Sequence, residues 1–266
     1  MKQIEELVKW FYGKEKVLVA LSGGVDSALV AYAAQKALSN QAIAVTADYK
    51  TLSQEELETA KMVCKEIGIR HIIIEYNELD NPDFVKNDQN RCLHCRTELS
   101  EHLLRLAKAE KISIIVDGTN LDDLTEYRPG LIALKKSGVQ SPLVETGFTK
   151  LDVRGVAKKI SLSIHDKPSN SCLASRIPWG NIVTAEKLAR IEKSETMIKQ
   201  LFGVRQVRVR DFGNSATIEV DKDEIVLLDN EKNMLILKEY MNQFGFNTVL
   251  VDPSGYRSGK LNVITD

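Results

Sequence analysis

The chain has 266 residues with a formal net charge of −1, and 43% of its residues are hydrophobic and 27% charged. This composition is ordinary for a globular protein of one large or two modest domains. It excludes a membrane-spanning chain, because no apolar run approaches the ~20 residues of a span, and it disfavours a nucleic-acid partner, because neither half has a basic excess. The acid-containing N-terminus lacks a signal-peptide hydrophobic region, so we expect a cytoplasmic protein.

Short apolar runs alternate with helical segments along the first two thirds of the chain. The expected strands are 16–21, 42–47, 69–76 and 113–117, and the expected helices are 3–12, 26–39, 53–67 and 93–110. Ser53 and Glu56 form a capping-box pattern, and residues 77–90 read as a loop. This alternation predicts an α/β fold with a parallel sheet, whose ligands bind beyond the carboxyl ends of the strands.

The last third of the chain has a different pattern. A short helix is expected within 147–161 and a loop-like segment at 163–180. The expected elements that follow are a long helix at 184–202, hairpin strands at 204–210 and 215–220, helix within 222–244 and a strand at 248–251. We therefore expect two domains. Residues 1–180 form the parallel-sheet domain, and residues 181–266 form a small α+β domain.

A glycine-rich turn joins the first strand to the following helix, with the sequence Ser22-Gly23-Gly24-Val25-Asp26-Ser27. Its glycines allow a sharp turn and close approach of a ligand, and the unpaired N–H groups of the helix start suit phosphate. Ser22 and Ser27 add hydroxyl donors, and Asp26 adds an oxygen suited to Mg²⁺. Neither the Walker A pattern nor G-x-G-x-x-G is present.

This turn resembles the PP-loop, the SGGxDS signature of ATP pyrophosphatases. The resemblance implies that the loop grips the pyrophosphate end of ATP, and that the enzyme transfers AMP to a substrate oxygen and releases pyrophosphate. An ordinary glycine turn is the alternative. All six motif positions, a preceding strand and a following helix favour the PP-loop.

Further characteristic segments follow along nearly the whole chain: Asp117-Gly118-Thr119-Asn120, Glu126 to Gly130, Ser171 to Gly180, Val207 to Arg210 and Gly255 to Lys260. In this order, they resemble the LarE family of ATP-dependent sulfur transferases, one branch of the PP-loop enzymes. The resemblance implies a role in biosynthesis of the nickel-pincer nucleotide cofactor. Members adenylate a carboxylate of pyridinium-3,5-dicarboxylic acid mononucleotide and replace the activated oxygen with sulfur.

The resemblance also assigns roles to particular residues. Those expected at ATP are Ser22, Gly23, Gly24, Asp26, Ser27, Asp117, Gly118, Asn120 and Arg128, with Asp26 at Mg²⁺. Those expected at the anionic substrate are Arg176, Arg208, Arg210 and Arg257. Arg208 and Arg210 alternate along a strand and so share a face, where a guanidinium fork suits carboxylate or phosphate. For any one of these arginines, a solvated salt bridge is the alternative.

The four cysteines are Cys64, Cys92, Cys95 and Cys172, and in a cytosolic chain they indicate metal or catalysis before disulfides. Cys172 matches the position at which one LarE form gives up its own sulfur. Cys92 and Cys95, which that form lacks, make three thiolates with Cys172, and this resembles the branch with a catalytic 4Fe–4S cluster that has one open iron for sulfide. Cys64 reads as a small buried hydrophobe.

Other interpretations of the cysteines remain open. His94 could complete a zinc site, or the Cys92–Cys95 pair could be redox-active with Cys172 as a persulfide carrier.

Three rival functions also remain: a tRNA thiolase, an amide-forming synthetase of the NAD or GMP kind, and an adenine-nucleotide sensor. The expected partners are a small nucleotide substrate and sulfide or another sulfur donor. The LarE resemblance adds a homo-oligomer, although no stretch of the sequence identifies its interface.

Overall fold

The computed structural model describes residues 2–125 and 129–257. Its chain divides into two compact units, the first made of Met1–Glu78 with Cys92–Asn170 and the second of Leu79–Arg91 with Ser171–Asp266. The expected domains, 1–180 and 181–266, remain a prediction about the chain's organisation. In the described residues no helix has the length and apolarity that a membrane span requires.

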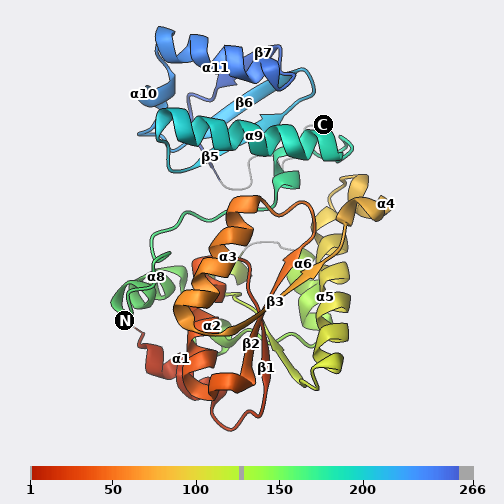
Figure 1. The fold of residues 1–266 in the computed structure, drawn as a ribbon, viewed down its shortest axis with the longest axis vertical. Coiled ribbons are helices and arrows are strands. Elements are labelled where there is room, and N and C mark those ends of the chain that lie inside the picture. The colour runs from red at the N-terminus through yellow and green to blue at the C-terminus, as the bar shows by residue number, and fades with distance from the viewer. Residues whose placement is uncertain (1, 126–128, 258–266) are drawn as a thin grey trace. The chain divides into compact units, whose positions relative to one another are not determined.

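The first unit is built on a four-stranded parallel sheet (Figure 1). Its strands are β1 (Val17–Ala20), β2 (Ala42–Asp48), β3 (Arg70–Glu75) and β4 (Ile114–Val116), in the order β3-β2-β1-β4. The α/β prediction is therefore confirmed. Because β1 lies at the centre between β2 and β4, the loop that follows β1 is flanked by the carboxyl ends of both neighbours.

Two apolar cores cover the two faces of this sheet, because side chains alternate between the faces of a strand. In β2, Ala42 and Ala44 face one core, and Ile43 and Val45 face the other. Helices α1 (Ile4–Phe11), α2 (Val25–Leu38), α3 (Gln54–Ile67) and α8 (Lys150–Lys159) contribute to the first core. Helices α5 (Arg91–Ala109) and α6 (Pro129–Lys136) contribute to the second.

The structure corrects several local expectations. Residues 77–90 contain the 3₁₀ helix η2 (Glu78–Asp80) and the short helix α4 (Pro82–Val85), which Asn81 caps and the proline initiates. The unpredicted helices α6 and α7 (Pro142–Glu145) also begin at prolines. Of these places, only residues 77–90 are expected from the sequence to form a loop, because they are polar and contain a proline; no element is predicted for 129–136 or 142–145.

The second unit is a small three-stranded mixed sheet with helices packed on one face. Strands β5 (Val207–Asp211), β6 (Ser215–Val220) and β7 (Thr248–Val251) follow the order β5-β6-β7. The first pair is antiparallel and the second parallel. Helices α9 (Ala185–Phe202) and α11 (Glu231–Gln243) share an apolar core with the sheet, and the short α10 (Ile225–Leu228) precedes α11.

Paired charges are buried in this second unit. Arg176, in the 3₁₀ helix η4 (Leu173–Arg176), is fully buried and forms a bidentate pair with Glu195 of α9, at 2.8 and 2.9 Å. Glu195 also accepts a bond from the backbone N–H of Val209 in β5. A buried charge of this kind requires its partner, because solvation is lost without replacement when the partner is removed.

We therefore expect Glu195→Gln to destabilise the protein by about 3 kcal/mol, since it leaves the Arg176 guanidinium buried without a counter-charge. The measurement is the free energy of unfolding in urea. Lys193→Gln, an exposed charge change on the same helix, is the matched control and should stay within about 0.5 kcal/mol of wild type. If Glu195→Gln is as stable as wild type, the Glu195 carboxylate is not the counter-charge that the buried Arg176 requires.

Candidate nucleotide and cysteine sites

The predicted phosphate loop runs from the end of β1 into the first turn of α2. The Ser22 backbone N–H donates to Ser27 Oγ at 3.2 Å, and Ser27 Oγ donates to the Gly24 carbonyl at 3.0 Å. Gly24 is the N-cap of α2 and offers no side-chain cap. The N–H groups of the first turn therefore remain available to an anion at the positive end of the helix dipole.

Two glycines allow the backbone to pass close to this loop. Gly23 has φ +80°, and a Cβ there would lie 2.7 Å from the Glu56 carbonyl oxygen of α3. Gly118, just after β4, would place a Cβ 2.5 Å from the backbone nitrogen of Ser27. Neither position has room for a larger residue, so the loop is held between α3 and the β4 end.

Asp26, the expected Mg²⁺ residue, lies in a cluster of polar groups. Asn120 Nδ2 donates to its Oδ1 at 3.2 Å, and the ammonium group of Lys150, from the start of α8, pairs with its Oδ2. The Lys150 backbone N–H donates to Asp122 Oδ2 at 2.7 Å. The structure thus brings Asp26 and Asn120 together and adds a cation that sequence reasoning missed.

The β4 end contributes a second ordered carboxylate. Asp117 is almost fully buried and accepts bonds from Thr119 N at 3.1 Å, Thr119 Oγ1 at 2.6 Å and Ser141 Oγ at 2.8 Å. These bonds fix its orientation at the loop that Gly118 begins. Its expected role beside ATP remains a prediction.

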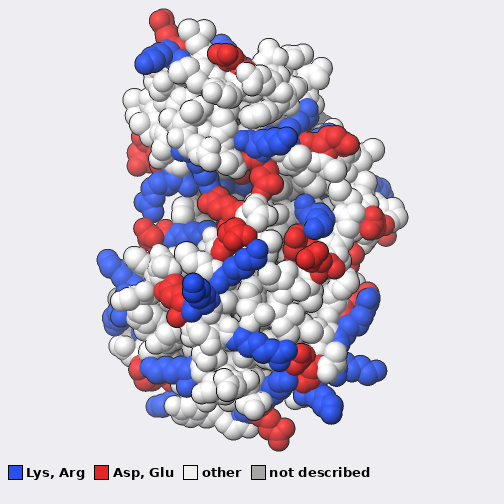
Figure 2. Space-filling model, in the orientation of Figure 1, with Lys and Arg blue, Asp and Glu red and all other residues white. Residues whose placement is uncertain are grey.

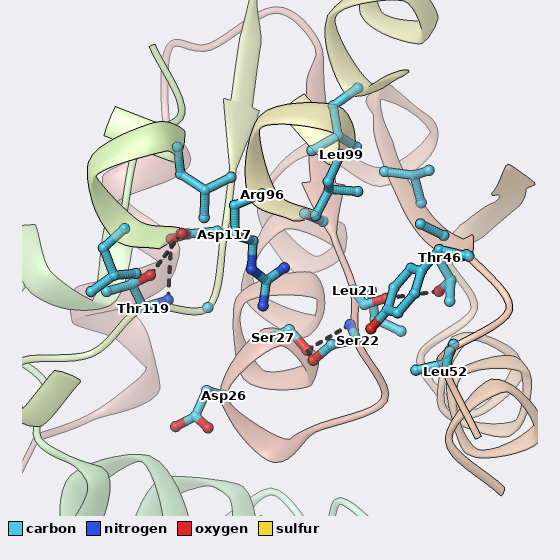
Figure 3. Close-up of a pocket in the computed structure, with 18 of the residues that line it drawn as sticks. Leu21, Ser22, Asp26, Ser27, Thr46, Leu52, Arg96, Leu99, Asp117 and Thr119 are labelled. Atoms are coloured by element: carbon cyan, nitrogen blue, oxygen red, sulfur yellow. Dashed lines mark hydrogen bonds between the residues drawn. The ribbon is translucent and has the colours of Figure 1, made fainter. Parts of the chain in front are cut away.

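A cavity opens above the loop at the carboxyl ends of β1, β2 and β4 (Figure 3). One part of its wall is polar and includes Ser22, Asp26, Ser27 and Asp117. The rest is mainly apolar and is lined by Ala20, Val45, Ala47, Leu52, Leu99, Leu103, Leu131 and Leu134. An apolar slot that ends in phosphate-binding groups suits a nucleotide, with its base in the slot and its phosphates at the loop.

Glu56 connects this loop to the segment that follows α8. Its carboxylate pairs with Lys167 at 2.8 Å and accepts a bond from Asn170 at 3.0 Å. Lys167 also donates to the Gly23 carbonyl at 3.3 Å. The expected capping box at Ser53 is therefore only half formed: Ser53 accepts from the Glu56 backbone N–H, while the Glu56 side chain binds Lys167 and Asn170.

The cysteines differ in their surroundings. Cys92 is exposed and Cys95 partly exposed in the first turns of α5, within the first unit. Cys172, also partly exposed, belongs to the second unit. Cys64 is buried, which raises the pKa of its thiol to about 12. All four lie in the described chain and none forms a disulfide.

A metal site requires several ligating side chains close together, and the cysteines are candidates for such a set. Among residues 2–125 and 129–257, no three His, Cys, Asp or Glu side chains gather in a metal-binding arrangement.

The buried carboxyl group of Glu78 lies beside Cys95. Burial raises its pKa to about 7, although hydrogen bonds, including one of 2.5 Å from Thr51, act in the opposite direction. The predicted 4Fe–4S ligation remains a prediction.

The Cys172 segment packs on the arginine-bearing strand of the second unit. Arg176 donates to the carbonyls of Ser171 at 2.6 Å and Cys172 at 3.0 Å. Arg210 of β5 donates to the Ser175 carbonyl at 3.1 Å. The predicted sulfur residue and these predicted substrate arginines are therefore brought together, with Arg176 bound to the Cys172 backbone and Glu195 rather than facing solvent.

The other predicted arginines lie in different environments. Arg208 is buried on β5, and its guanidinium lies 5.2 Å over the Tyr256 ring. Burial and the nearby charge of Arg176 lower its pKa. Arg257 is exposed, and Arg128 lies outside the described residues.

Sequence reasoning missed several groups around the nucleotide cavity, namely Tyr49, Glu56, Arg96, Asp123, Lys150 and Lys167. None belongs to the glycine loop, and most come from elements far away in the chain. For Arg96, the only available signal was its position directly after Cys95.

Part or nearly all of the chain is similar in sequence to several known proteins. The NAD synthase family model matches residues 1–112. An uncharacterized Synechocystis protein is 41% identical over 98% of this chain and 97% of its own length, and one from Methanocaldococcus jannaschii is 28% identical over 96% of each. The pyridinium-3,5-bisthiocarboxylic acid mononucleotide synthase of Lactiplantibacillus plantarum is 30% identical over 93% of this chain and 89% of its own.

The backbone crossing at Gly118 yields a test of the nucleotide site. Gly118→Ala forces a methyl group against the first turn of α2, and overpacking of about 1–3 kcal/mol would weaken ATP binding by roughly ten- to hundredfold. Calorimetric titration with a nonhydrolysable ATP analogue measures this loss.

Thermal unfolding of Gly24→Ala provides the steric control, because a methyl group there meets only Ser22 Oγ, at 3.5 Å. It should unfold near the wild-type temperature. Wild-type ATP affinity in Gly118→Ala would show that the crossing does not shape the site.

Proposed function

The chain belongs to the LarE family of ATP-dependent sulfur transferases, and we propose that it converts a carboxylate of pyridinium-3,5-dicarboxylic acid mononucleotide into a thiocarboxylate. This product would serve biosynthesis of the nickel-pincer nucleotide cofactor. The observation that carries the proposal is the nucleotide cavity that ends at Ser22, Asp26 and Ser27. The match to the synthase over nearly the whole chain supports it.

In the first step, an oxygen of the substrate carboxylate attacks the α-phosphorus of ATP. A P–O bond forms, the bond between the α- and β-phosphates breaks, and pyrophosphate leaves. The loop N–H groups and the Ser22 and Ser27 hydroxyls would bind the departing pyrophosphate. Lys150, which pairs with Asp26, adds a cation beside the same loop.

The oxygen donors near the loop fit Mg²⁺, which prefers carboxylates and phosphates. Asp26 would hold it, with the Asp117 carboxylate nearby at the β4 end. When bound, Mg²⁺ would neutralise charge on the phosphates. The ammonium group of Lys150 pairs with the same carboxylate.

In the second step, hydrosulfide attacks the acyl carbon of the adenylate. A C–S bond forms and the C–O bond to the phosphate breaks, so AMP leaves with the electron pair and no net oxidation occurs. A carboxylate resists such attack, whereas the acyl phosphate provides a good leaving group. Adenylation and sulfur transfer are therefore obligatorily ordered.

Three thiols outside the apolar cores fit the donor set of a 4Fe–4S cluster with one open iron. Cys92, Cys95 and Cys172 would hold it, and all three are at least partly exposed. When bound, the cluster would offer inorganic sulfide a coordination site. Cys64 is excluded from this set by its burial.

An anionic substrate would suit the arginines of the second unit. Arg176 pairs with Glu195 and Arg210 with Glu219, while Arg208 donates to the Val207 carbonyl at 2.8 Å and lies over the Tyr256 ring. The lowered pKa of Arg208 reflects burial and the charge of Arg176. A substrate phosphate or carboxylate would accept charge-assisted hydrogen bonds from Arg208.

The rival functions receive less support. On the face viewed in Figure 2, basic and acidic side chains are interspersed and no extended basic surface is visible, which disfavours a tRNA substrate. The match to NAD synthase covers residues 1–112 and does not reach Cys172, so it supports ATP use without indicating amide formation.

The first experiment is anaerobic purification followed by iron, acid-labile sulfide and zinc analysis. Wild type and Cys64→Ala should each hold about four iron and four sulfide per chain, and Cys172→Ala should lose them. Incubation with ATP, mononucleotide and sulfide should then give AMP, pyrophosphate and a thiocarboxylate detected by mass spectrometry.

Dehydroalanine at Cys172, in protein without iron or sulfide, would instead establish a sacrificial sulfur donor. Zinc bound at Cys92 and Cys95 would contradict the cluster. Pyrophosphate release without any sulfur-containing product would contradict the sulfur transfer itself.

A second test uses the arginine cluster. Arg208→Met should raise the KM for the mononucleotide by roughly ten- to hundredfold, because a charge-assisted bond contributes about 1.5–3 kcal/mol, and the KM for ATP should not change. Its unfolding should remain a single cooperative transition, so that a change in KM can be separated from a loss of structure.

Arg210→Met is the matched comparison. It leaves Glu219 buried without its partner, so it should lower the unfolding temperature. An unchanged KM for the mononucleotide in Arg208→Met would rule out the anion site.

A further inference from the structure

Arg96 is a cation of the nucleotide cavity to which neither the phosphate loop nor the family signature assigns a role. It lies on α5, directly after Cys95 and one helical turn after Cys92. It lines the cavity together with Ser22, Ser27 and Asp117. In Figure 3 its side chain extends from α5 toward the loop, with the guanidinium group near Ser27.

Within the described residues, the guanidinium group of Arg96 differs from the lysines of the site. Lys150 is paired with Asp26, and Lys167 with Glu56. Arg96 makes no side-chain hydrogen bond or ion pair with any residue in 2–125 or 129–257. Its planar fork of N–H donors suits a phosphate group in the cavity.

The stem of Arg96 is held in place by a glycine. A Cβ at Gly130 of α6 would lie 2.7 Å from Arg96 Cγ and 3.2 Å from the Cys92 carbonyl oxygen. The first turn of α6 can approach α5 this closely only because residue 130 has no side chain. The close approach of α6 therefore restricts the space around the Arg96 stem, whereas the guanidinium group lies further along the side chain.

Arg96 connects the nucleotide cavity with the thiol pair of α5. It lines the cavity together with Asp117 and Tyr49, and it directly follows Cys95 on α5. Its side chain extends from this helix toward the phosphate loop (Figure 3). A ligand phosphate bound by Arg96 would lie on the cysteine side of the cavity.

We propose that Arg96 is a positioning residue that binds the α-phosphate of the nucleotide and retains it after pyrophosphate has left the loop. This inference rests on the proposed function, in which that phosphate belongs to the acyl-adenylate. Arg96 donates hydrogen bonds and transfers no proton. By holding the phosphate it keeps the activated carbonyl beside Cys92 and Cys95 while sulfur is delivered.

The test compares equilibrium binding of AMP, ATP and adenosine by the full-length protein. In Arg96→Ala, AMP affinity should fall about tenfold or more, because a charge-assisted bidentate contact is lost. ATP affinity should fall less, since the loop still binds its outer phosphates, and adenosine affinity should not change. Arg96→Lys should recover part of the AMP affinity.

Arg105→Ala is the matched control, because Arg105 is on the same helix and exposed, in a surface pair with Glu101. It should bind all three ligands as wild type does. Wild-type AMP affinity in Arg96→Ala would overturn the inference, as would an equal loss for adenosine, which would indicate a general effect on cavity shape. A wild-type protein that does not bind AMP would overturn it as well.

These measurements need neither mononucleotide nor sulfide, so they separate the two proposals. Arg96-dependent AMP binding in a protein that makes no thiocarboxylate would contradict the proposed function and leave the role of Arg96 intact. If the protein forms the thiocarboxylate but binds AMP equally well without Arg96, the proposed function is supported and the role of Arg96 is contradicted.

Discussion

The close crossing of Gly118 over the first turn of α2 determines the nucleotide site. With only 2.5 Å between an imagined Cβ and Ser27 N, the end of β4 rests directly on the phosphate loop. This contact places Asn120 within hydrogen-bond distance of Asp26 and orients Asp117 toward the cavity. The central position of β1 in the sheet makes the crossing possible, because β4 is its direct neighbour. Sheet order and one missing side chain thus assemble three separate segments into one site.

The sequence was sufficient to predict the parallel sheet, the loop and the grouping of Asp26 with Asn120. These features depend on local patterns: apolar strands, a glycine turn, and polar residues at strand ends. Lys150, Lys167 and Arg96 could not be found this way, because each reaches the cavity through tertiary packing of its helix or loop. The short helices α4, α6 and α7 were missed because proline and polar residues favour loops and helix starts alike.

The second unit illustrates why an arginine motif does not by itself reveal the role of each arginine. Arg208 and Arg210 share a face of β5, as alternation predicts, yet Arg210 is bound to Glu219 and Ser175. Arg176 supports the backbone of Cys172 and is matched by Glu195. Burial and hydrogen-bond partners thus differ among arginines that belong to the same sequence pattern. A sequence pattern contains neither kind of information.

The burial of Cys64 has a practical consequence for experiments that modify thiols. Burial keeps this sulfur protonated at neutral pH, with a pKa of about 12, and the thiolate is the form that reacts with alkylating reagents. Cys92, Cys95 and Cys172 are all at least partly accessible. In the native protein, alkylation therefore reports on these three positions without any need to replace Cys64. Protection of a thiol by a ligand or by oxidation can be read directly from peptide masses.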